Sequence, residues 1–225
     1  MSELFSIQLQ NRQQQGGDGV WLDLPTTTEQ VQATLRQIGI SSDNPQGLFI
    51  SGYFAEEEKR FAIPYNMVLA SNVDELNFLA SRLETLSTGE RAELNAALQA
   101  PQSELFSIGR ITDFPENVEY YVYLPDVRGP AQLGDYYLNR SGMVDMPEEW
   151  KGGIDTAQFG RYVAQQEQGV FTECGYLVKS GDAWQKVHEG QPVPEEYRVL
   201  SFPATEVLRD AANIPPPVQP ETEPQ

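Results

Sequence analysis

The chain has 225 residues and a formal net charge of −18, from 33 acidic and 15 basic side chains. A charge of this sign repels nucleic acid, anionic lipid and acidic substrates and attracts basic surfaces, which argues against direct binding to a phosphate backbone. The single cysteine, Cys174, excludes an internal disulfide framework, and the single histidine, His188, leaves no His-rich metal site.

The acidic charge is spread along the whole chain and is not confined to a tail. Residues 1–100 carry 13 acidic and 6 basic side chains, and the remaining residues carry 20 and 9. The N-terminal segment lacks the basic start and apolar run of a signal peptide, and no segment approaches the roughly 18 apolar residues of a membrane span. We therefore expect a soluble, cytoplasmic protein.

The first 70 residues are predicted to form a small α+β module. Alternating apolar and polar side chains predict a strand at residues 5–9, and a second strand follows at residues 20–24. Two more strands are predicted at residues 48–54 and 61–69, on either side of the acidic loop at residues 56–58.

Three capping boxes predict helix starts, because a polar residue followed three positions later by Glu can satisfy free backbone N–H groups. Gly39 is well placed to end the first of these helices, and the other two form a helical hairpin over residues 72–99. The three pairs are Thr26 with Glu29, Asn72 with Glu75, and Ser87 with Glu90.

Phe78 lies on the polar side of the first hairpin helix when the sequence is placed on a helical wheel. This position predicts an exposed side chain. It is either an isolated surface residue, which is common, or a contact to another module or subunit.

The hexapeptide SELFSI occurs twice, at residues 2–7 and 103–108. The residues after each copy argue against duplicated domains. Alternation continues to Leu9 in the first copy, whereas Leu105, Ile108 and Ile111 are three apart, a helical spacing. We therefore predict a strand for the first copy and a helix for the second, since context overrides local propensity.

The second half of the chain alternates between predicted strands and helices. The strands are predicted at residues 119–124 and 197–202, with a β-hairpin of residues 175–187 between them. Helices are predicted at residues 131–139, from Pro147 to Trp150, and from Asp155 onward. The Pro-rich residues from 214 to the C-terminus have nothing to bury and are expected to be disordered or extended.

The sequence gives little support to a catalytic function. Cys174 and His188 lie near the predicted hairpin with no nucleophile-elbow motif, and there is no phosphate-binding P-loop. The paired glutamates at residues 148–149 and 195–196 point to different sides of a helix and are expected to be solvated. Carboxylates spaced three and four residues apart on helices lie about 5–6 Å apart, a spacing that a phosphate-binding groove can accept.

Four stretches together resemble antirestriction proteins of the ArdA type. The resemblance covers roughly residues 5–179 and depends on the order and spacing of the stretches, since no single motif is specific. They are Gly19 to Pro25 with the helix ending at Gly39; Asp74 to Ala80 with Leu83-Glu84 and the second helix; Leu133 to Tyr136 leading to Met146-Pro147-Glu148; and Ile154-Asp155 with Phe159 to Arg161, Phe171-Thr172 and Gly175-Tyr176.

The resemblance implies an elongated α+β protein of three small modules with a C-terminal extension. We expect an α+β module at residues 1–70, a helical module at 71–115, an α+β module with a β-hairpin at 116–203, and a helical end with a disordered tail at 204–225. The family mimics B-form DNA and occupies the DNA groove of the methyltransferase core of type I restriction-modification enzymes, for the benefit of a plasmid or conjugative transposon. Such proteins are homodimers without an active site, a cofactor or a metal, and they do not bind nucleic acid directly.

The implied DNA-mimic carboxylates form an array on the surface, although each alone is an ordinary surface acid. The candidates are Glu56, Glu57, Glu58, Asp74, Glu75 and Glu84 in the first two modules, and Asp113, Glu116, Glu119, Asp126, Asp135, Asp145, Glu148, Glu149 and Asp155 in the later ones. Phe78 is the candidate inter-module or dimer contact.

Two other interpretations remain open. The chain is alternatively an acidic, non-catalytic adaptor of a mobile element that binds a protein partner through Phe78, Trp150 or the Pro-rich tail. A hydrolase that uses paired carboxylates would need a deep pocket with two converging acids. Basic residues among the acids, such as Arg128 and Arg140, lower the charge density below that expected of a strong mimic.

Overall fold

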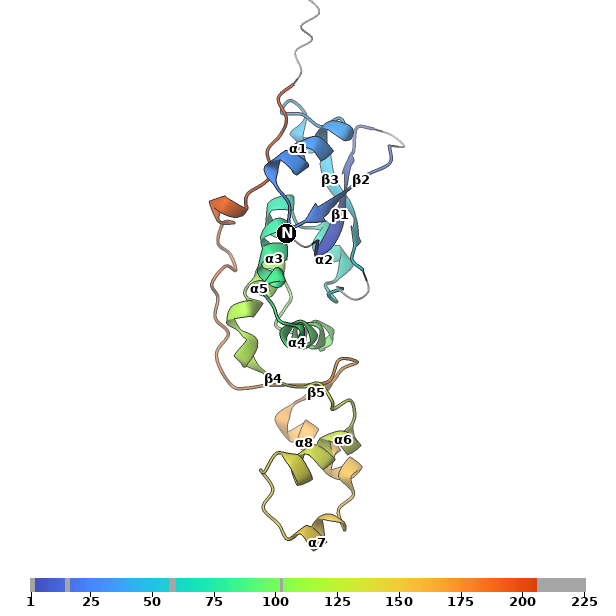
Figure 1. Cartoon of the computed structure of the whole chain (residues 1–225), viewed down its shortest axis with the longest axis vertical. Helices are drawn as coiled ribbons and strands as arrows, with labels where there is room; N and C mark the ends of the chain where they lie inside the picture. The colour runs from blue at the N-terminus through green and yellow to red at the C-terminus, as the bar shows by residue number, and fades with distance from the viewer. Residues whose placement is uncertain (1–2, 15–16, 57–59, 102, 206–225) are drawn as a thin grey trace, which may run out of the picture.

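The computed structural model describes residues 3–14, 17–56, 60–101 and 103–205. It confirms a mixed α+β fold, and the molecule is elongated, with a sheet at one end, helices in the middle and a helical region at the other end (Figure 1). No helix within these described residues is long and apolar enough to cross a membrane.

The first sheet is formed by three antiparallel strands in the order β2-β1-β3, where β1 is Phe5–Asn11, β2 is Val20–Leu24 and β3 is Leu48–Phe54. The predicted alternation places Ile7 and Leu9 in the core, where both are fully buried. Helix α1, Thr28–Gln37, packs against this sheet and is capped by Thr27 with Gln30. The predicted cap at Thr26 and Glu29 is therefore wrong by one residue.

Residues 61–69 do not form the predicted strand. Residues 61–64 are extended without a partner strand, and helix α2, Tyr65–Leu69, follows from a cap at Pro64. Proline lacks the N–H that a central strand needs, and its φ of −58° suits a helix start. The apolar side chains of Phe61 and Ile63 still reach the core.

The two central helices begin where their capping boxes predict. Helix α3, Val73–Glu84, is capped by Asn72 with Glu75, and α4, Thr88–Gln99, by Ser87 with Glu90. One core of buried apolar side chains extends from Leu4, just before β1, through both helices. The division of the chain at residues 70, 115 and 203 stays a prediction, since this core is shared across the first boundary.

The second SELFSI copy is not a helix over its length. Residues 103–107 form a loop, and helix α5, Ile108–Thr112, begins at the last residue of the copy with Ser107 as its cap. The helical prediction is correct only from Ile108 onward. Leu105 and Ile111 nevertheless both lie in the core, which explains their spacing.

The second sheet joins the central helices to the far end of the molecule. It has the order β4-β6-β5, from β4 (Tyr121–Leu124), β5 (Val170–Phe171) and β6 (Tyr176–Lys179). Tyr121 and Leu177 face the main core, whereas Tyr176 and Leu124 belong to a separate, smaller cluster on the other face. Because successive side chains of a strand point to opposite faces, this one sheet packs against two separate cores.

The predicted hairpin is wrong in its second arm. Residues 183–187 are not a strand, and β6 pairs instead with β4 and β5. The chain leaves the sheet after Lys179 because Trp184 packs edge-on against Tyr120, with ring centroids 5.1 Å apart. Likewise β4 begins at Tyr121, since the residues before it form a 3₁₀ turn.

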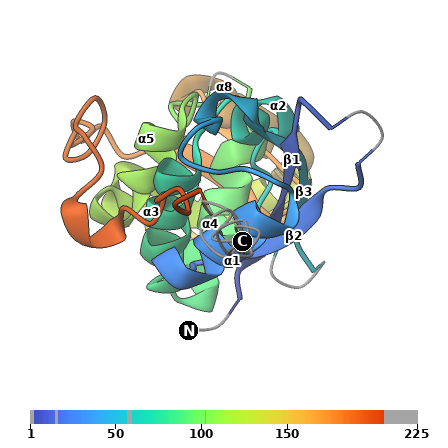
Figure 2. The same ribbon diagram turned by 90° about the horizontal axis from the view of Figure 1, so that it is seen from above.

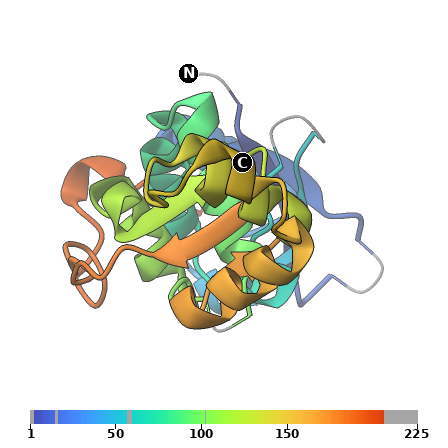
Figure 3. The same cartoon turned by 90° about the horizontal axis from the view of Figure 1, so that it is seen from below.

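The far end of the molecule is built from two helices in very close contact, seen nearest the viewer in Figure 3. Helix α6, Pro130–Asp135, continues into a π-helical turn at Tyr136–Arg140, and it packs on α8, Thr156–Glu167. A Cβ on Gly134 would lie 1.9 Å from the carbonyl oxygen of Thr156, and one on Gly160 would lie 1.8 Å from that of Pro130. Only glycine fits at these two contacts. The short helix α7, Glu148–Lys151, lies at the tip (Figure 1).

The last described part of the chain, residues 182–205, is called here the C-terminal strap. It runs back from the second sheet along α5 and α3 to the first sheet's end of the molecule (Figure 1), on the side of those helices away from the strands (Figure 2). A 3₁₀ turn at Glu195–Tyr197 is its one regular element in the described residues, so the predicted strand at residues 197–202 is wrong. The predicted disordered tail lies outside the described residues.

Replacing Gly160 by alanine is expected to destabilise the far end by about 1–3 kcal/mol, because the added methyl group forces α6 and α8 apart. The free energy of opening is measured by hydrogen exchange of the α6 and α8 amides. Gly89→Ala is the matched control, since Gly89 also lies in a helix but has no atom closer than 4.0 Å to its Cβ position. Equal effects of the two substitutions would contradict the tight helix contact.

Candidate functional site

The exposed members of the predicted array lie mainly toward the far end of the molecule. At the far end, 47% of the Asp135 side chain is exposed, whereas Glu56 is exposed near the first sheet. Glu57 and Glu58 lie outside the described residues. The exposed candidates beyond the second sheet are Asp126, Asp145, Glu148, Glu149 and Asp155, and Glu119 is exposed just before that sheet.

Helix ends hold several of these carboxylates in place. Asp155 caps α8 and accepts N–H groups from Ala157 and Gln158 at 2.9 and 3.0 Å. Glu148 and Glu149 lie in the first turn of α7. Negative charge is favourable at these positions, because the free N–H groups and the helix dipole both attract it. Helix starts therefore hold these carboxylates at fixed places on the surface.

Basic side chains neutralise part of this surface. Arg140 lies 3.2 Å from Asp135, and Lys151 lies 2.9 Å from Glu148. The carboxylate of each ion pair is accessible to solvent, so each ion pair contributes little to the stability of the fold. They reduce the local charge without covering the carboxylates, and a stronger cationic partner can compete for these acids.

Asp113 and Asp74 do not belong to the exposed array. Asp113 is 0% exposed and accepts three backbone N–H groups from residues 187–189, at 2.6 to 3.3 Å. Asp74 is half-buried and accepts the N–H groups of Val199 and Leu200, each at 2.7 Å. The prediction that Asp113 lies on the surface is wrong, because the sequence gives no sign that a distant segment returns to cover it.

Three further candidates also have partners within the fold. Glu75 accepts the backbone N–H of Asn72 at 3.3 Å as part of the capping box. Glu116 forms an ion pair with Arg82, where both side chains are less than a third exposed. Glu84 is half-buried at the end of α3, and its carbonyl oxygen accepts a hydrogen bond from Arg91 at 3.5 Å. The carboxylates of Glu75 and Glu116 therefore support local structure more than they present free charge.

Phe78 is buried, so the prediction of an exposed side chain is wrong. It is 5% exposed and packs against His188 and Tyr197 of the C-terminal strap, with ring centroids 4.9 and 4.7 Å apart. The helical wheel correctly separated it from the leucine face of α3. What the wheel could not show is that the strap supplies a second apolar surface.

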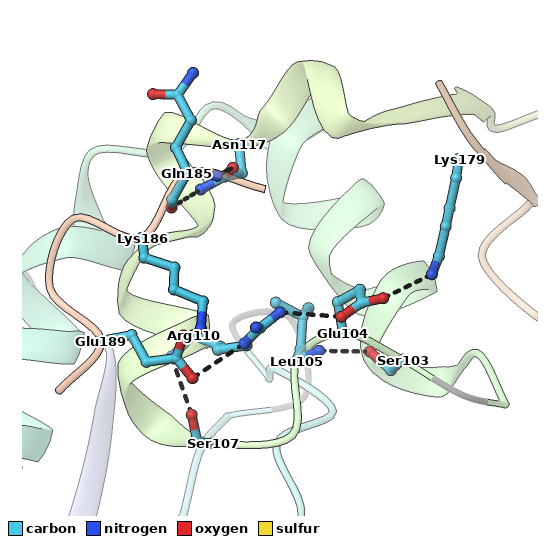
Figure 4. Close-up of polar contacts among 10 residues, drawn as sticks. All are labelled: Ser103, Glu104, Leu105, Ser107, Arg110, Asn117, Lys179, Gln185, Lys186 and Glu189. Atoms are coloured by element: carbon cyan, nitrogen blue, oxygen red, sulfur yellow. Dashed lines mark hydrogen bonds and ion pairs between the residues drawn. The ribbon is translucent and has the colours of Figure 1, made fainter. Parts of the chain in front are cut away.

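Two polar clusters were missed because their members are far apart in sequence. Arg110 is bound by Glu104 at 3.0 Å and by Glu189 at 3.1 Å (Figure 4). Glu104 also accepts a hydrogen bond from Lys179 at 2.7 Å, which holds the pKa of that carboxyl below its usual value. This network connects α5, β6 and the strap.

The second cluster lies in the small core of the far end. Glu167 accepts hydrogen bonds from the hydroxyl groups of Tyr137 and Tyr176, the latter at 2.9 Å. Burial, reinforced by these hydrogen bonds, raises the pKa of both tyrosines. Little in the sequence indicates that Glu167 is a hydrogen-bonded member of this core, since a glutamate at the end of an amphipathic helix usually faces solvent.

The described residues bring together no set of groups suited to catalysis. The Cys174 thiol is half-buried and accepts a hydrogen bond from Gln99 at 3.7 Å, whereas His188 packs on Phe78. Among these residues no three His, Cys, Asp or Glu side chains are placed to hold a metal ion. The paired glutamates at residues 148–149 and 195–196 are exposed, as predicted.

A family model described as "Antirestriction protein (ArdA)" matches residues 17–178, which is most of the chain. The chain belongs to the ArdA antirestriction family. No curated protein matches the chain, so the assignment depends on the family model and on the resemblance of the four stretches.

The ArdA match includes every exposed acid of the far end and stops before the C-terminal strap. The strap, with the contacts to Asp113 and Asp74, lies beyond the matched region.

Glu93 behaves differently from the other acids of the ArdA-matched region. It is half-buried on α4, and its Oε1 atom is buried without a hydrogen-bond partner. Burial, together with the nearby charge of Glu90, raises the pKa of Glu93 to about 7. This carboxyl is thus partly neutral near pH 7 and does not contribute a permanent charge to the surface.

Replacing Glu93 by glutamine is expected to raise the free energy of unfolding by about 1–2 kcal/mol at pH 8, after allowance for solvent screening. The folded pKa of about 7 lies above the unfolded value near 4.5, so the native state loses stability as pH rises between these values. The gain should therefore disappear at pH 4. Urea denaturation of both proteins at the two pH values measures it, and a gain that is independent of pH would contradict the buried carboxyl.

Proposed function

We propose that this ArdA-family protein inhibits type I restriction-modification enzymes by mimicking B-form DNA. The observation that supports this most directly is the exposure of five candidate carboxylates at the far end of an elongated, acidic molecule, with a sixth, Glu119, beside the second sheet. Duplex DNA carries one negative charge per roughly 1.7 Å of its axis, and enzymes that bind it present a basic groove. A row of carboxylates on a narrow body can occupy such a groove.

The supporting helices favour this function over a flexible acidic tail. The close contact of Gly134 and Gly160 with the opposite helix fixes α6 against α8. Asp155 and Glu149 lie at helix starts, where the backbone restricts their positions. A rigid array binds a preformed groove without the entropy cost of ordering a mobile segment.

The proposed array consists of the exposed or accessible acids, without those that the fold uses internally. Asp113 is excluded because it is buried, and Asp74, Glu75, Glu84 and Glu116 contribute less than predicted because each is half-buried. The remaining members among the described residues are Glu56, Glu119, Asp126, Asp135, Asp145, Glu148, Glu149 and Asp155. Glu57 and Glu58 lie outside the described residues and are included from the sequence alone.

The proposed partner is the methyltransferase core of a type I enzyme in the cytoplasm of a cell that receives a mobile element. The protein would act as a homodimer and as a stoichiometric inhibitor, without chemistry of its own. A net charge of −18 steers it to a basic groove and keeps it away from DNA itself.

One observation favours the alternative of an acidic adaptor. Trp150 and Met143 are 66% and 75% exposed at the tip around α7. Exposed Trp and Met side chains are typical of protein-binding surfaces. An adaptor that relied on them would bind its partner with little dependence on salt, whereas a mimic that relied on carboxylates would lose affinity steeply as salt rises.

Neutralising Glu148 and Glu149 together, as glutamines, is expected to weaken binding to a type I methyltransferase core by about 3- to 30-fold at low salt, since each contact between full charges is worth several tenths of a kcal/mol or more. Isothermal titration calorimetry measures the dissociation constant.

The chain contains a closely matched control in Glu195 and Glu196. Both pairs follow a proline, precede an aromatic residue and are exposed, but the second pair lies on the strap beyond the ArdA match. The Glu195→Gln, Glu196→Gln variant has the same net charge and should bind within about twofold of the unmodified protein. Equal weakening by the two variants would show a net-charge effect and contradict a specific array.

A further inference from the structure

The C-terminal strap begins at the second sheet with a set of contacts to α5 and the turn after it. Asn117 accepts the N–H of Gln185 at 2.7 Å and donates to its carbonyl oxygen at 2.9 Å. Figure 4 shows this pair above the ion pair between Arg110 and Glu189. The Arg110 guanidinium also lies over the Trp184 ring, 5.6 Å from its centre. This end of the strap is held by both polar and aromatic contacts.

Asp113 is the most enclosed of these attachments. Its Oδ1 accepts the His188 N–H at 2.6 Å, and its Oδ2 accepts the N–H groups of Val187 and Glu189 at 3.3 and 3.2 Å. A buried carboxylate is costly unless its charge is compensated. Here the strap backbone provides the hydrogen bonds that compensate the charge of the carboxylate, and the carboxylate in turn holds the strap in place.

A second set of contacts joins the strap to α3. Asn77 donates to the carbonyl oxygen of Tyr197 at 3.0 Å and accepts the Thr26 N–H at 2.7 Å, which links the strap to the loop before α1. Asp74 accepts the N–H groups of the two residues after Arg198. Between the two sets of contacts, residues 190–193 of the strap line a groove of about 580 Å³ against α2, α3 and α5.

The strap ends on the module that contains the first sheet. Gln32 of α1 donates to the Ser201 hydroxyl at 3.2 Å, and the Ser42 N–H donates to the Pro203 carbonyl at 2.9 Å. The Thr205 hydroxyl donates to Asp43. The strap therefore contacts structure on both sides of the central helices.

We propose that the C-terminal strap is a built-in brace, which fixes the N-terminal sheet module, α3 and α5 in one arrangement and so sets the shape of the rod. Rotation of the N-terminal module against α5 would break contacts at one end of the strap or the other. The brace is specific to the part of this chain beyond the ArdA match, which ends at residue 178.

The brace also bears on inhibition, and this consequence alone rests on the proposed function. The strap fixes the part of the separation between acids near the first sheet and acids at the far end that lies between the first and the second sheet. A preformed separation lowers the cost of binding, whereas a hinged rod has to be ordered by its partner.

Cleavage of the intact protein tests the brace directly. A protease site inserted after Gly181, an exposed turn residue, allows the strap to be cut from the body after folding. We expect the cut fragment, residues 182–225, to stay bound during gel filtration at micromolar concentration. Separation of the fragment from the cut but otherwise unmodified protein would overturn the proposal.

Asp113→Asn in the same cut protein should weaken retention of the fragment by at least about tenfold, because one of the two buried acceptor oxygens is replaced by an NH₂ donor that faces N–H groups. Asp126→Asn, a fully exposed acid with the same change, should leave retention unchanged. Asp74→Asn provides a second strap variant if Asp113→Asn does not fold. Equal retention in the strap variants and in the Asp126→Asn control would also overturn the proposal.

Spin labels test whether the strap fixes the shape. With Cys174 replaced by serine, labels are placed at Gln37 of α1 and at Glu119, two exposed positions on opposite sides of the central helices. The distance distribution should be narrow in the intact chain and broaden once the fragment has been removed. An unchanged width would contradict the brace. Loss of inhibition with a retained strap and a narrow distribution would instead count against the proposed function.

Discussion

The carboxylate of Asp113 accepts three backbone N–H groups from a segment more than 70 residues away in the sequence. This anchor sets the contacts next to it, because it places His188 against Phe78 and Glu189 against Arg110. With Phe78 covered, α3 becomes buried on two faces: one toward the leucine core and one toward the strap. The middle of the rod is therefore held from both sides.

The acidic residues of this protein thus fall into two groups with different physical roles. Asp113 is enclosed, whereas Asp74 and Glu167 are half-buried, and all three accept hydrogen bonds that hold distant segments together. Acids such as Glu149 and Asp155 lie exposed to water at helix starts. Sequence composition counts both groups alike, so a net charge of −18 overstates the charge that a partner meets.

Local patterns predicted the parts of the fold that are determined locally. The capping boxes at Asn72 and Ser87 and the alternation in β1 depend on neighbours within a few residues. The errors with the largest consequences occurred where distant segments decide the outcome: the strap replaces a predicted strand and hairpin arm, and it buries Phe78 and Asp113. Two smaller errors were local: the first helix cap is one residue away from Thr26, and a helix starts at Pro64 within a predicted strand. No pattern within the strap, which has little regular structure, indicates where it will lie. The ArdA family was recognisable because the order and spacing of several sequence stretches, none of them specific alone, can be compared without knowledge of the tertiary contacts.

The central claim is that exposed carboxylates on a braced rod take the place of DNA phosphates in a basic groove. Competition between the full-length protein and a duplex containing the recognition site, for one type I methyltransferase core, tests it most directly. The account predicts mutually exclusive binding, with an affinity of the protein that falls as salt rises. A ternary complex of enzyme, duplex and protein at low salt would contradict it.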